Sequence, residues 1–138
     1  MKSQKQSDVS VLYTKFYVDD TGKHISNIFS DVINQVNVKN LWEGVVDAFY
    51  NFECVNYFAC LHGDLRIVIA TDQGNSNYKF NQYFISGLDG KIIKIQPQIW
   101  FGIHNLNSGN SVLINGFTGN GNNFERMSSK IFNWHSKR

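Results

Sequence analysis

Residues 55–71, VNYFACLHGDLRIVIAT, carry the strongest secondary-structure signal in the chain. Two runs of β-branched, aromatic and small apolar residues, 55–61 and 65–71, stand on either side of His62-Gly63-Asp64. Runs of this length and composition are typical of strands, and a short polar segment with a glycine is typical of a tight turn. We therefore predict a strand at 55–61 that returns as a second strand at 65–71, within a fold built from short strands.

The same alternation of strand-like runs and turn residues extends towards both ends of the sequence. Segment 42–50 can be read as helix or strand, but its β-branched and aromatic residues and the lack of a preceding helix cap favour a strand. Segment 127–134 is predicted to form a short terminal helix. The other predicted strands are 9–18, 24–29, 31–38, 79–86, 91–95, 100–106 and 112–117.

About eight to ten short strands with turn signals every ~8–12 residues are typical of a β sandwich or barrel. The chain has 138 residues, enough for one domain with its own core, and no repeat, linker or change of composition marks a second domain. We predict an all-β single domain that spans residues 1–138, with 1–8 as a flexible tail.

Charge and cysteine content narrow the classes of function. The formal net charge is only +2, and its basic excess lies near the chain ends, so we predict no nucleic-acid surface. No run of about 18 apolar residues is present to span a membrane, and residues 1–7 lack the apolar core of a signal peptide. Cys54 and Cys60 are about 20 Å apart if they share one extended segment, too far for a disulfide. Free thiols fit a reducing compartment, so we expect a cytoplasmic protein.

Short motifs in a consistent order resemble one enzyme family, the dTDP-4-dehydrorhamnose 3,5-epimerases. The resemblance covers roughly residues 10–134, and it implies a cupin or jelly-roll β-barrel, usually a homodimer, that acts on nucleotide-linked 4-keto sugars for surface polysaccharides. The motifs are Asp20-Thr21-Gly22, the cysteine-x-x-glycine turn and β-branched strand of 60–69 with Asp72, the loop and strand end of 76–86, and the proline-containing segment 95–106.

The family's chemistry requires a base that removes a proton next to a ketone, usually a histidine oriented by an aspartate, and donors that stabilise the enolate oxygen. Two registers fit the strand that carries this base. Matching Gly44 to the family's glycine puts Val46 at the base position, whereas matching Tyr50 to the following tyrosine puts Phe49 there. Neither register supplies a histidine, since none occurs between residues 25 and 61.

Other parts of the family's site are also replaced. Thr21 stands in place of the arginine that would bind the diphosphate, and Asn56 in place of the lysine that would face the substrate. Phe101 replaces a histidine, and the catalytic tyrosine falls on Gly119 or Asn120. The loss of all these groups together predicts either different chemistry or none.

The remaining candidate catalytic residues are Asp47, Tyr50 and Tyr83. Asp47 is the one acid between Glu43 and Glu53 in a mostly apolar segment, so an inward orientation would raise its pKa and make it a candidate base. In the alternative interpretation Asp47 faces outward or pairs with the backbone, and the tyrosines only fill space. Candidate substrate-binding residues, at or near the matched positions, are Asn56, Phe101, His104 and Asn115.

Two hypotheses of function follow. The first is a nucleotide-sugar epimerase or isomerase with a rebuilt active site. The second is a barrel without that chemistry, which binds a sugar nucleotide or stabilises a partner subunit. In either case we expect no metal and no cofactor, because the four histidines are scattered. We also expect a two-fold homodimer in which segment 9–18 covers a strand edge of the neighbouring subunit.

Overall fold

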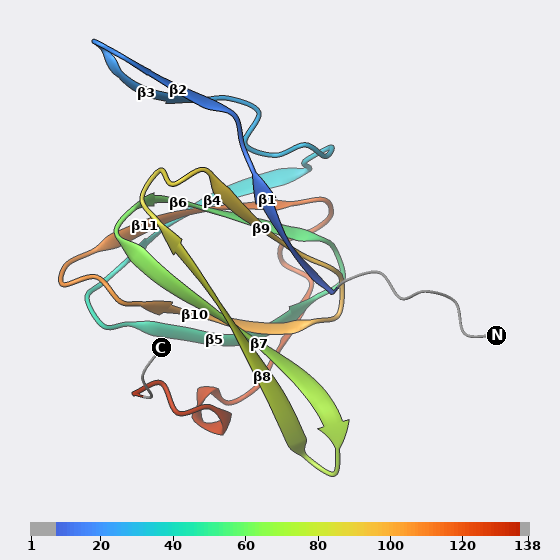
Figure 1. Cartoon of the computed structure of the whole chain (residues 1–138). Helices are drawn as coiled ribbons and strands as arrows, with labels where there is room; N and C mark the ends of the chain where they lie inside the picture. The colour runs from blue at the N-terminus through green and yellow to red at the C-terminus, as the bar shows by residue number, and fades with distance from the viewer. Residues whose placement is uncertain (1–7, 136–138) are drawn as a thin grey trace.

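The computed structural model describes residues 8–135, and its regular structure is almost entirely antiparallel β (Figure 1). Two five-stranded sheets face each other as layers. The first sheet contains, in spatial order, β1 (Val9–Tyr13), β9 (Lys91–Ile95), β6 (Asn56–His62), β11 (Ser111–Phe117) and β4 (Gln35–Leu41). The second contains β12 (Phe124–Arg126), β5 (Val46–Phe52), β10 (Trp100–Asn105), β7 (Asp64–Gly74) and β8 (Asn77–Ser86).

A separate two-stranded hairpin, β2 (Phe16–Asp19) and β3 (Gly22–Ile25), projects from the first sheet (Figure 1).

The all-β prediction and the cupin-type architecture are confirmed. The two sheets form a sandwich, however, and not a closed barrel. The helix expected at 127–134 is reduced to one 3-10 turn, Ser129–Ile131, and the strand β12 just before it was not predicted. The tail expected at 1–8 lies, apart from Asp8, outside the described residues.

The two strands of segment 55–71 do not pair with each other. β6 pairs with β9 and β11 in the first sheet, whereas β7 pairs with β8 and β10 in the second. The turn between them therefore carries the chain from one layer to the other. Gly63 has a φ of +91° there, and a Cβ atom on it would collide with Ser111, so the turn requires glycine.

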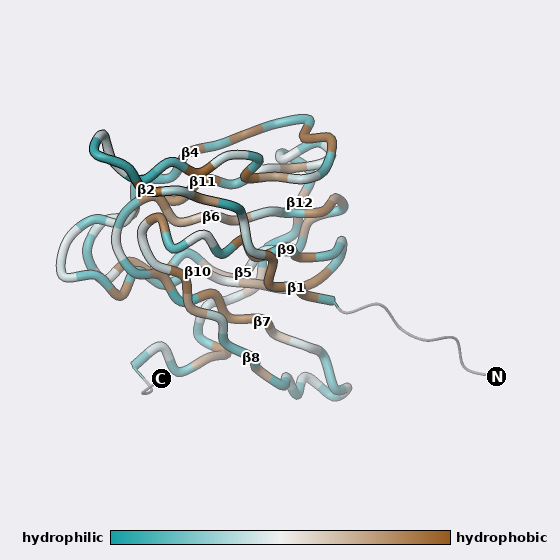
Figure 2. The backbone as a smooth tube through the Cα atoms, turned by 45° about the horizontal axis from the view of Figure 1, so that its top comes forward, coloured by the Kyte–Doolittle hydropathy of each residue, from teal (hydrophilic) through white to brown (hydrophobic). Residues whose placement is uncertain are grey.

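Most of the space between the layers is filled by apolar side chains from both sheets. Figure 2 shows hydrophobic stretches recurring along the strands of both layers. The outer faces are partly covered as well, which explains why β6 is buried at 56–60 and β7 at 65–70. The central core consists of Phe52, Phe58, Leu65, Ile67, Ile69, Ile85, Ile93, Ile95, Phe101, Ile103, Leu113, Phe117 and their neighbours.

A register shift between β10 and β5 decides which residues of β5 face the interior. Phe101 and Ile103 both lie in the central core, and their cross-strand partners are Tyr50 and Asp47. Directly opposed residues share a face of a sheet, so Tyr50 and Asp47 both face inward. The two residues between them, 48 and 49, belong to the cluster on the outer face.

That outer face is covered by the chain after β12. Trp134 lies 5.4 Å from the Phe49 ring, and its carbonyl accepts a hydrogen bond of 2.5 Å from the buried Arg66 guanidinium. On the first sheet, Phe29 and its neighbours cover Tyr57 in the same way. No helix among residues 8–135 has the length and apolar character needed to cross a membrane.

Candidate functional site

Polar side chains enter the interior on the side where β4 and β12 form the sheet edges. β4 alternates in burial, with Gln35, Asn37 and Lys39 half-buried and Val36 and Val38 exposed. Strand β4 thus turns its polar residues towards the second sheet. Arg126 on β12 is the cross-strand partner of Tyr50 and lies on the same inner face.

Four side chains meet at this edge, and we call Lys39, Asp47, Tyr50 and Arg126 the Asp47 cluster. The Tyr50 hydroxyl donates a hydrogen bond of 2.5 Å to Asp47 Oδ1, and Lys39 Nζ donates one of 3.1 Å to Asp47 Oδ2. Lys39 Nζ lies 5.5 Å and the Arg126 guanidinium 5.1 Å from the centre of the Tyr50 ring. Both oxygens of the carboxylate are therefore engaged by the protein itself.

The surroundings of Tyr50 keep its phenol protonated. Burial, the hydrogen bond to Asp47 and the charge of Asp47 raise the pKa of Tyr50 to about 12, although Arg126 opposes the shift. At neutral pH Tyr50 can therefore donate a proton in a hydrogen bond but cannot act as a base.

The inner face of the first sheet carries a group of amides beside this cluster. Asn115 donates hydrogen bonds to Asn56 Oδ1 (3.3 Å) and to the carbonyl of Tyr57 (3.1 Å). Asn37, the cross-strand partner of Asn115, accepts a hydrogen bond of 3.1 Å from Gln35. We call Gln35, Asn37, Asn56 and Asn115 the amide group.

Aromatic rings of both sheets share the interior with these amides. Phe52 and Phe101 stack at 5.7 Å, and Phe58 meets Phe101 at 5.2 Å. Phe124 lies 5.3 Å from Phe52 and is partly exposed at the edge. Phe101, predicted to contact substrate, is thus packed within the aromatic core.

The structure brings together some of the predicted site residues and separates others. Asp47 and Tyr50 are in direct contact, and Asn56 and Asn115 are hydrogen-bonded to each other. Tyr83 faces the same interior from β8, but β8 is three strands away from β5 in the sheet. At ~4.8 Å per strand spacing this is roughly 14 Å, so Tyr83 is not part of the Asp47 cluster.

His104 points to the outer face of the second sheet. Its Nδ1 lies 2.7 Å from an Arg66 nitrogen, and its ring meets Trp134 edge-on. Burial, with the charge of Arg66, lowers the pKa of His104 below its ordinary value of 6.5. A neutral ring accepts this hydrogen bond, so His104 serves to hold the covering segment and does not face the interior.

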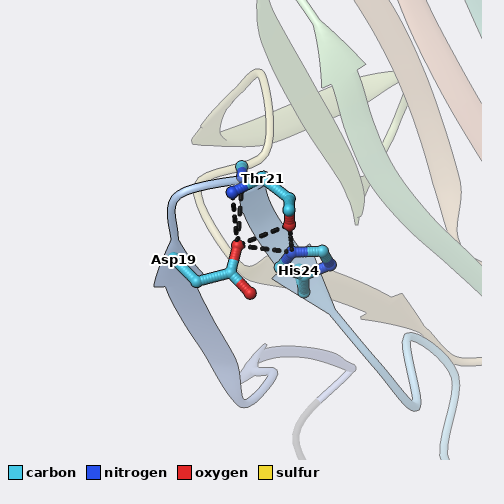
Figure 3. Close-up of polar contacts among 4 residues, drawn as sticks. Asp19, Thr21 and His24 are labelled. Atoms are coloured by element: carbon cyan, nitrogen blue, oxygen red, sulfur yellow. Dashed lines mark hydrogen bonds and ion pairs between the residues drawn. The ribbon is translucent and has the colours of Figure 1, made fainter.

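The other three histidines also lie away from the interior. His62 is exposed at the end of β6, and His135 is exposed near the chain end. His24 lies on the projecting hairpin, 3.0 Å from Asp19 (Figure 3). None of the four histidines of the chain is therefore placed to act as the interior base.

Thr21, which the sequence motifs matched to a diphosphate-binding arginine, lies in the hairpin turn beside Asp19 and His24 (Figure 3). Asp19 Oδ1 accepts hydrogen bonds from the backbone N–H (2.8 Å) and the hydroxyl (2.6 Å) of Thr21. These bonds to Thr21, followed by the contact with His24, lower the pKa of Asp19. The group closes the exposed hairpin turn.

Sequence reasoning missed Lys39, Arg126 and two of the four amides. The alternation in 31–38 indicated a strand but not which of its faces is buried, and β4 is an edge strand that exposes Val36 and Val38. The sequence signal for this face is the polar residue at every second position, 35, 37 and 39.

Asp47 and Tyr50 are absent from the linings of four cavities of about 130–250 Å³ in the described part of the chain. One of about 250 Å³ lies under the base of the β2–β3 hairpin and includes Lys23 and Ile92. Among residues 8–135, no three His, Cys, Asp or Glu side chains gather as metal ligands would. The Asp47 cluster is a set of polar groups at an edge that already bond to one another.

The two facing antiparallel sheets define a β sandwich of the cupin type. Its similarity to solved nucleotide-sugar epimerases and isomerases is close in fold and distant in sequence. A dTDP-4-dehydrorhamnose 3,5-epimerase from Sulfolobus tokodaii aligns over 98% of this chain and 85% of its own, with a TM-score of 0.79 and 16% identity. A dTDP sugar isomerase from Desulfovibrio desulfuricans covers 94% and 92%, with a TM-score of 0.77 and 15% identity.

A third structure, the 3,4-ketoisomerase QdtA from Thermoanaerobacterium thermosaccharolyticum, aligns over 89% of this chain and 90% of its own. The TM-score is 0.66 and the identity 14%. No protein-family model and no curated protein matches the sequence. These likenesses establish the fold that the sequence motifs suggested.

Proposed function

We propose that this chain is a nucleotide-sugar-binding protein of sugar biosynthesis, with the fold of the dTDP-4-keto-sugar epimerases and isomerases but without 3,5-epimerase activity. The observation that supports this proposal most directly is the hydrogen bonding of Asp47. It is the acid on the inner face of β5, and both of its oxygens accept hydrogen bonds from Tyr50 and Lys39. No histidine of the chain faces the interior beside it.

The binding part of the proposal is supported by the chemistry of the edge. Amides can bond sugar hydroxyls or a base edge, partly exposed aromatic rings can stack on a base or sugar, and Lys39 and Arg126 can offset phosphate charge. Two of the structural neighbours carry such ligands: the QdtA variant holds TDP-4-keto-6-deoxyglucose, and a Legionella pneumophila epimerase holds dTDP-4-keto-L-rhamnose. A polysaccharide pathway is the role that this fold and ligand class favour.

The absence of epimerisation follows from proton chemistry. An epimerase must take a proton from carbon and return one on the opposite face, which requires a free base and an acid. Tyr50 is protonated at neutral pH and can only donate. Asp47 is the acid on this inner face, and its carboxylate is already bound to the Tyr50 hydroxyl and to Lys39.

Calorimetric titration with dTDP tests the binding function. We expect saturable binding that weakens at least tenfold in Tyr50→Ala, because Tyr50 lies beside both cations of the edge. Tyr83→Ala is the matched control, since Tyr83 lies on the same face three strands away. Absence of binding to the folded wild-type chain would refute the proposal.

A second candidate is a keto-sugar isomerase that uses Asp47 as base and Tyr50 as acid. The observation in its favour is the 2.5 Å hydrogen bond between the two groups on one inner face. It predicts solvent exchange of substrate protons that vanishes in Asp47→Asn while the fold is intact. Exchange that survives Asp47→Asn, Tyr50→Phe and Tyr83→Phe would place catalysis outside all the residues considered.

We also propose that the chain forms a two-fold homodimer. Tyr13, Phe16, Tyr17 and Val18 are 52–73% exposed along β1 and the projecting hairpin, an apolar surface that a second copy would cover. Light scattering should give twice the monomer mass, and a monomer at micromolar concentration would refute the dimer.

A cytoplasmic location is supported by Cys54 and Cys60, which are both free thiols.

A further inference from the structure

Two cations flank one aromatic ring at the open edge of the sandwich. Lys39 lies on β4 of the first sheet and Arg126 on β12 of the second, and each is close to the ring of Tyr50. Because the two distances of 5.5 and 5.1 Å share the ring centre, Lys39 Nζ and the Arg126 guanidinium are at most about 10.6 Å apart. One diphosphate can reach both groups across that interval through charge-assisted hydrogen bonds of about 2.8 Å.

The two cations differ in how they are balanced. Lys39 is paired with Asp47, whereas Arg126 forms no ion pair with any carboxylate among residues 8–135. The side chains of Lys39 and Asp47 are 32% and 23% exposed, and Arg126 is exposed, so an anion from solvent can approach them. The edge thus offers one free positive charge and a second one held by an internal anion.

We infer that Lys39 and Arg126 form the diphosphate-binding pair of the nucleotide-sugar site, and that the Asp47 carboxylate occupies Lys39 until the ligand displaces it. The inference rests on the proposed function, because a nucleoside diphosphate is the part of the ligand that it places. Thr21 has no charge with which to bind a diphosphate, and the inference gives this role to two residues on the sheet edges. Asp47 then acts as a competing anion at the phosphate position.

If Asp47 competes with the ligand for Lys39, removing its charge should strengthen dTDP binding. Asp47→Asn removes the internal negative charge and leaves Lys39 free, so dTDP should bind several-fold more tightly than to the wild type. A carboxylate remote from the phosphate position gives no such gain. Lys39→Gln and Arg126→Gln should each weaken dTDP binding about tenfold or more, since each removes a charged hydrogen bond to phosphate.

The outer face supplies a matched control. Lys94 Nζ lies 5.6 Å from the Tyr57 ring, and the Tyr57 hydroxyl donates a 3.0 Å hydrogen bond to Asp31, which repeats the lysine–tyrosine–aspartate arrangement outside the interior. Lys94→Gln and Asp31→Asn should therefore leave dTDP affinity within about twofold of wild type. Circular dichroism of every variant establishes that the fold is retained.

Calorimetry with dTDP, thymidine and inorganic pyrophosphate separates the possible results. The inference is supported if Lys39→Gln and Arg126→Gln weaken dTDP and pyrophosphate but leave thymidine unchanged, while Asp47→Asn tightens both anions. If dTDP binds the wild type and all three variants equally, the inference is overturned and the proposed function stands. If pyrophosphate binds and dTDP gains nothing over it, the anion site stands and the nucleotide-sugar function falls. If neither ligand binds, both are overturned.

Discussion

The pKa of the Tyr50 phenol is raised by the surroundings of this residue in the candidate site. Its raised pKa has three contributions, burial first and then the hydrogen bond and charge of Asp47. The protonated form is the one that the fold stabilises. This contribution to stability is therefore present below pH 10 and is lost as the pH rises from 10 through about 12.

Titration of the tyrosine ring carbons by NMR tests this assignment. We expect Tyr50, identified by its loss in Tyr50→Phe, to titrate near pH 12 and to move down towards 10 in Asp47→Asn. Tyr57, which bonds Asp31, is the internal reference, since its pKa is also raised to about 12 and should not change in Asp47→Asn. A Tyr50 midpoint near 10 in the wild-type protein would contradict the burial of Tyr50 and its hydrogen bond to Asp47.

His104 gives a prediction of opposite sign. Burial and Arg66 lower its pKa, so the fold favours the neutral ring. The associated stability is present above pH 6.5 and is lost as the pH falls through the lowered pKa. Histidine NMR should show a midpoint for His104 below 6.5, and His104→Gln should flatten the decline of the unfolding free energy below that pH. A midpoint at or above 6.5 would contradict the burial of His104 against Arg66.

At the scale of the element, the register shift in β5 determines the chemistry of the interior. At this shift β10 approaches β5 closely. A Cβ atom on Gly102 of β10 would collide with the Cβ of Ala48 and lie 3.0 Å from Trp134. Glycine therefore allows Ala48 to face outward while Asp47 and Tyr50 face inward.

Gly102→Ala tests this packing. The added methyl must move β5 or the covering Trp134, which costs about 1–3 kcal/mol of unfolding free energy as for other overpacked cores. Gly109→Ala is the control, since nothing lies within 4 Å of its Cβ position and the change should stay within about 0.5 kcal/mol. Denaturant unfolding measures both. Equal stability of Gly102→Ala and the wild type would show that β5 does not approach β10 as described.

Most strands could be predicted from the sequence, because β-branched runs between glycine and polar turns are a local signal. The inward-facing residues of β5, the strand matched to the base position, could not be predicted, since a register shift breaks its two-residue period. Val46 and Phe49, the two residues considered for that position, both lie in the outer cluster. Lys39 was missed for a related reason, because only the arrangement of the sheets shows that β4 is an edge.

At the scale of the whole molecule, the similarity to solved structures lies in the fold. The layers match dTDP-sugar epimerases and isomerases over nearly the whole chain at 12–16% identity, as the neighbours show. Fold alone does not define activity. The proposed function therefore depends on the Asp47 cluster, where polar groups satisfy one another and no histidine is present.

Deuterium exchange from solvent into TDP-4-keto-6-deoxyglucose, followed by NMR at a saturating concentration of protein, tests the central claim most directly. Loss of a general base lowers a rate by a factor of ~10²–10⁴, and loss of the enolate-stabilising donors adds a comparable factor. We predict bound sugar nucleotide with no deuterium at C3 or C5 above the protein-free rate. Incorporation at either carbon that rises in proportion to protein concentration would contradict the account.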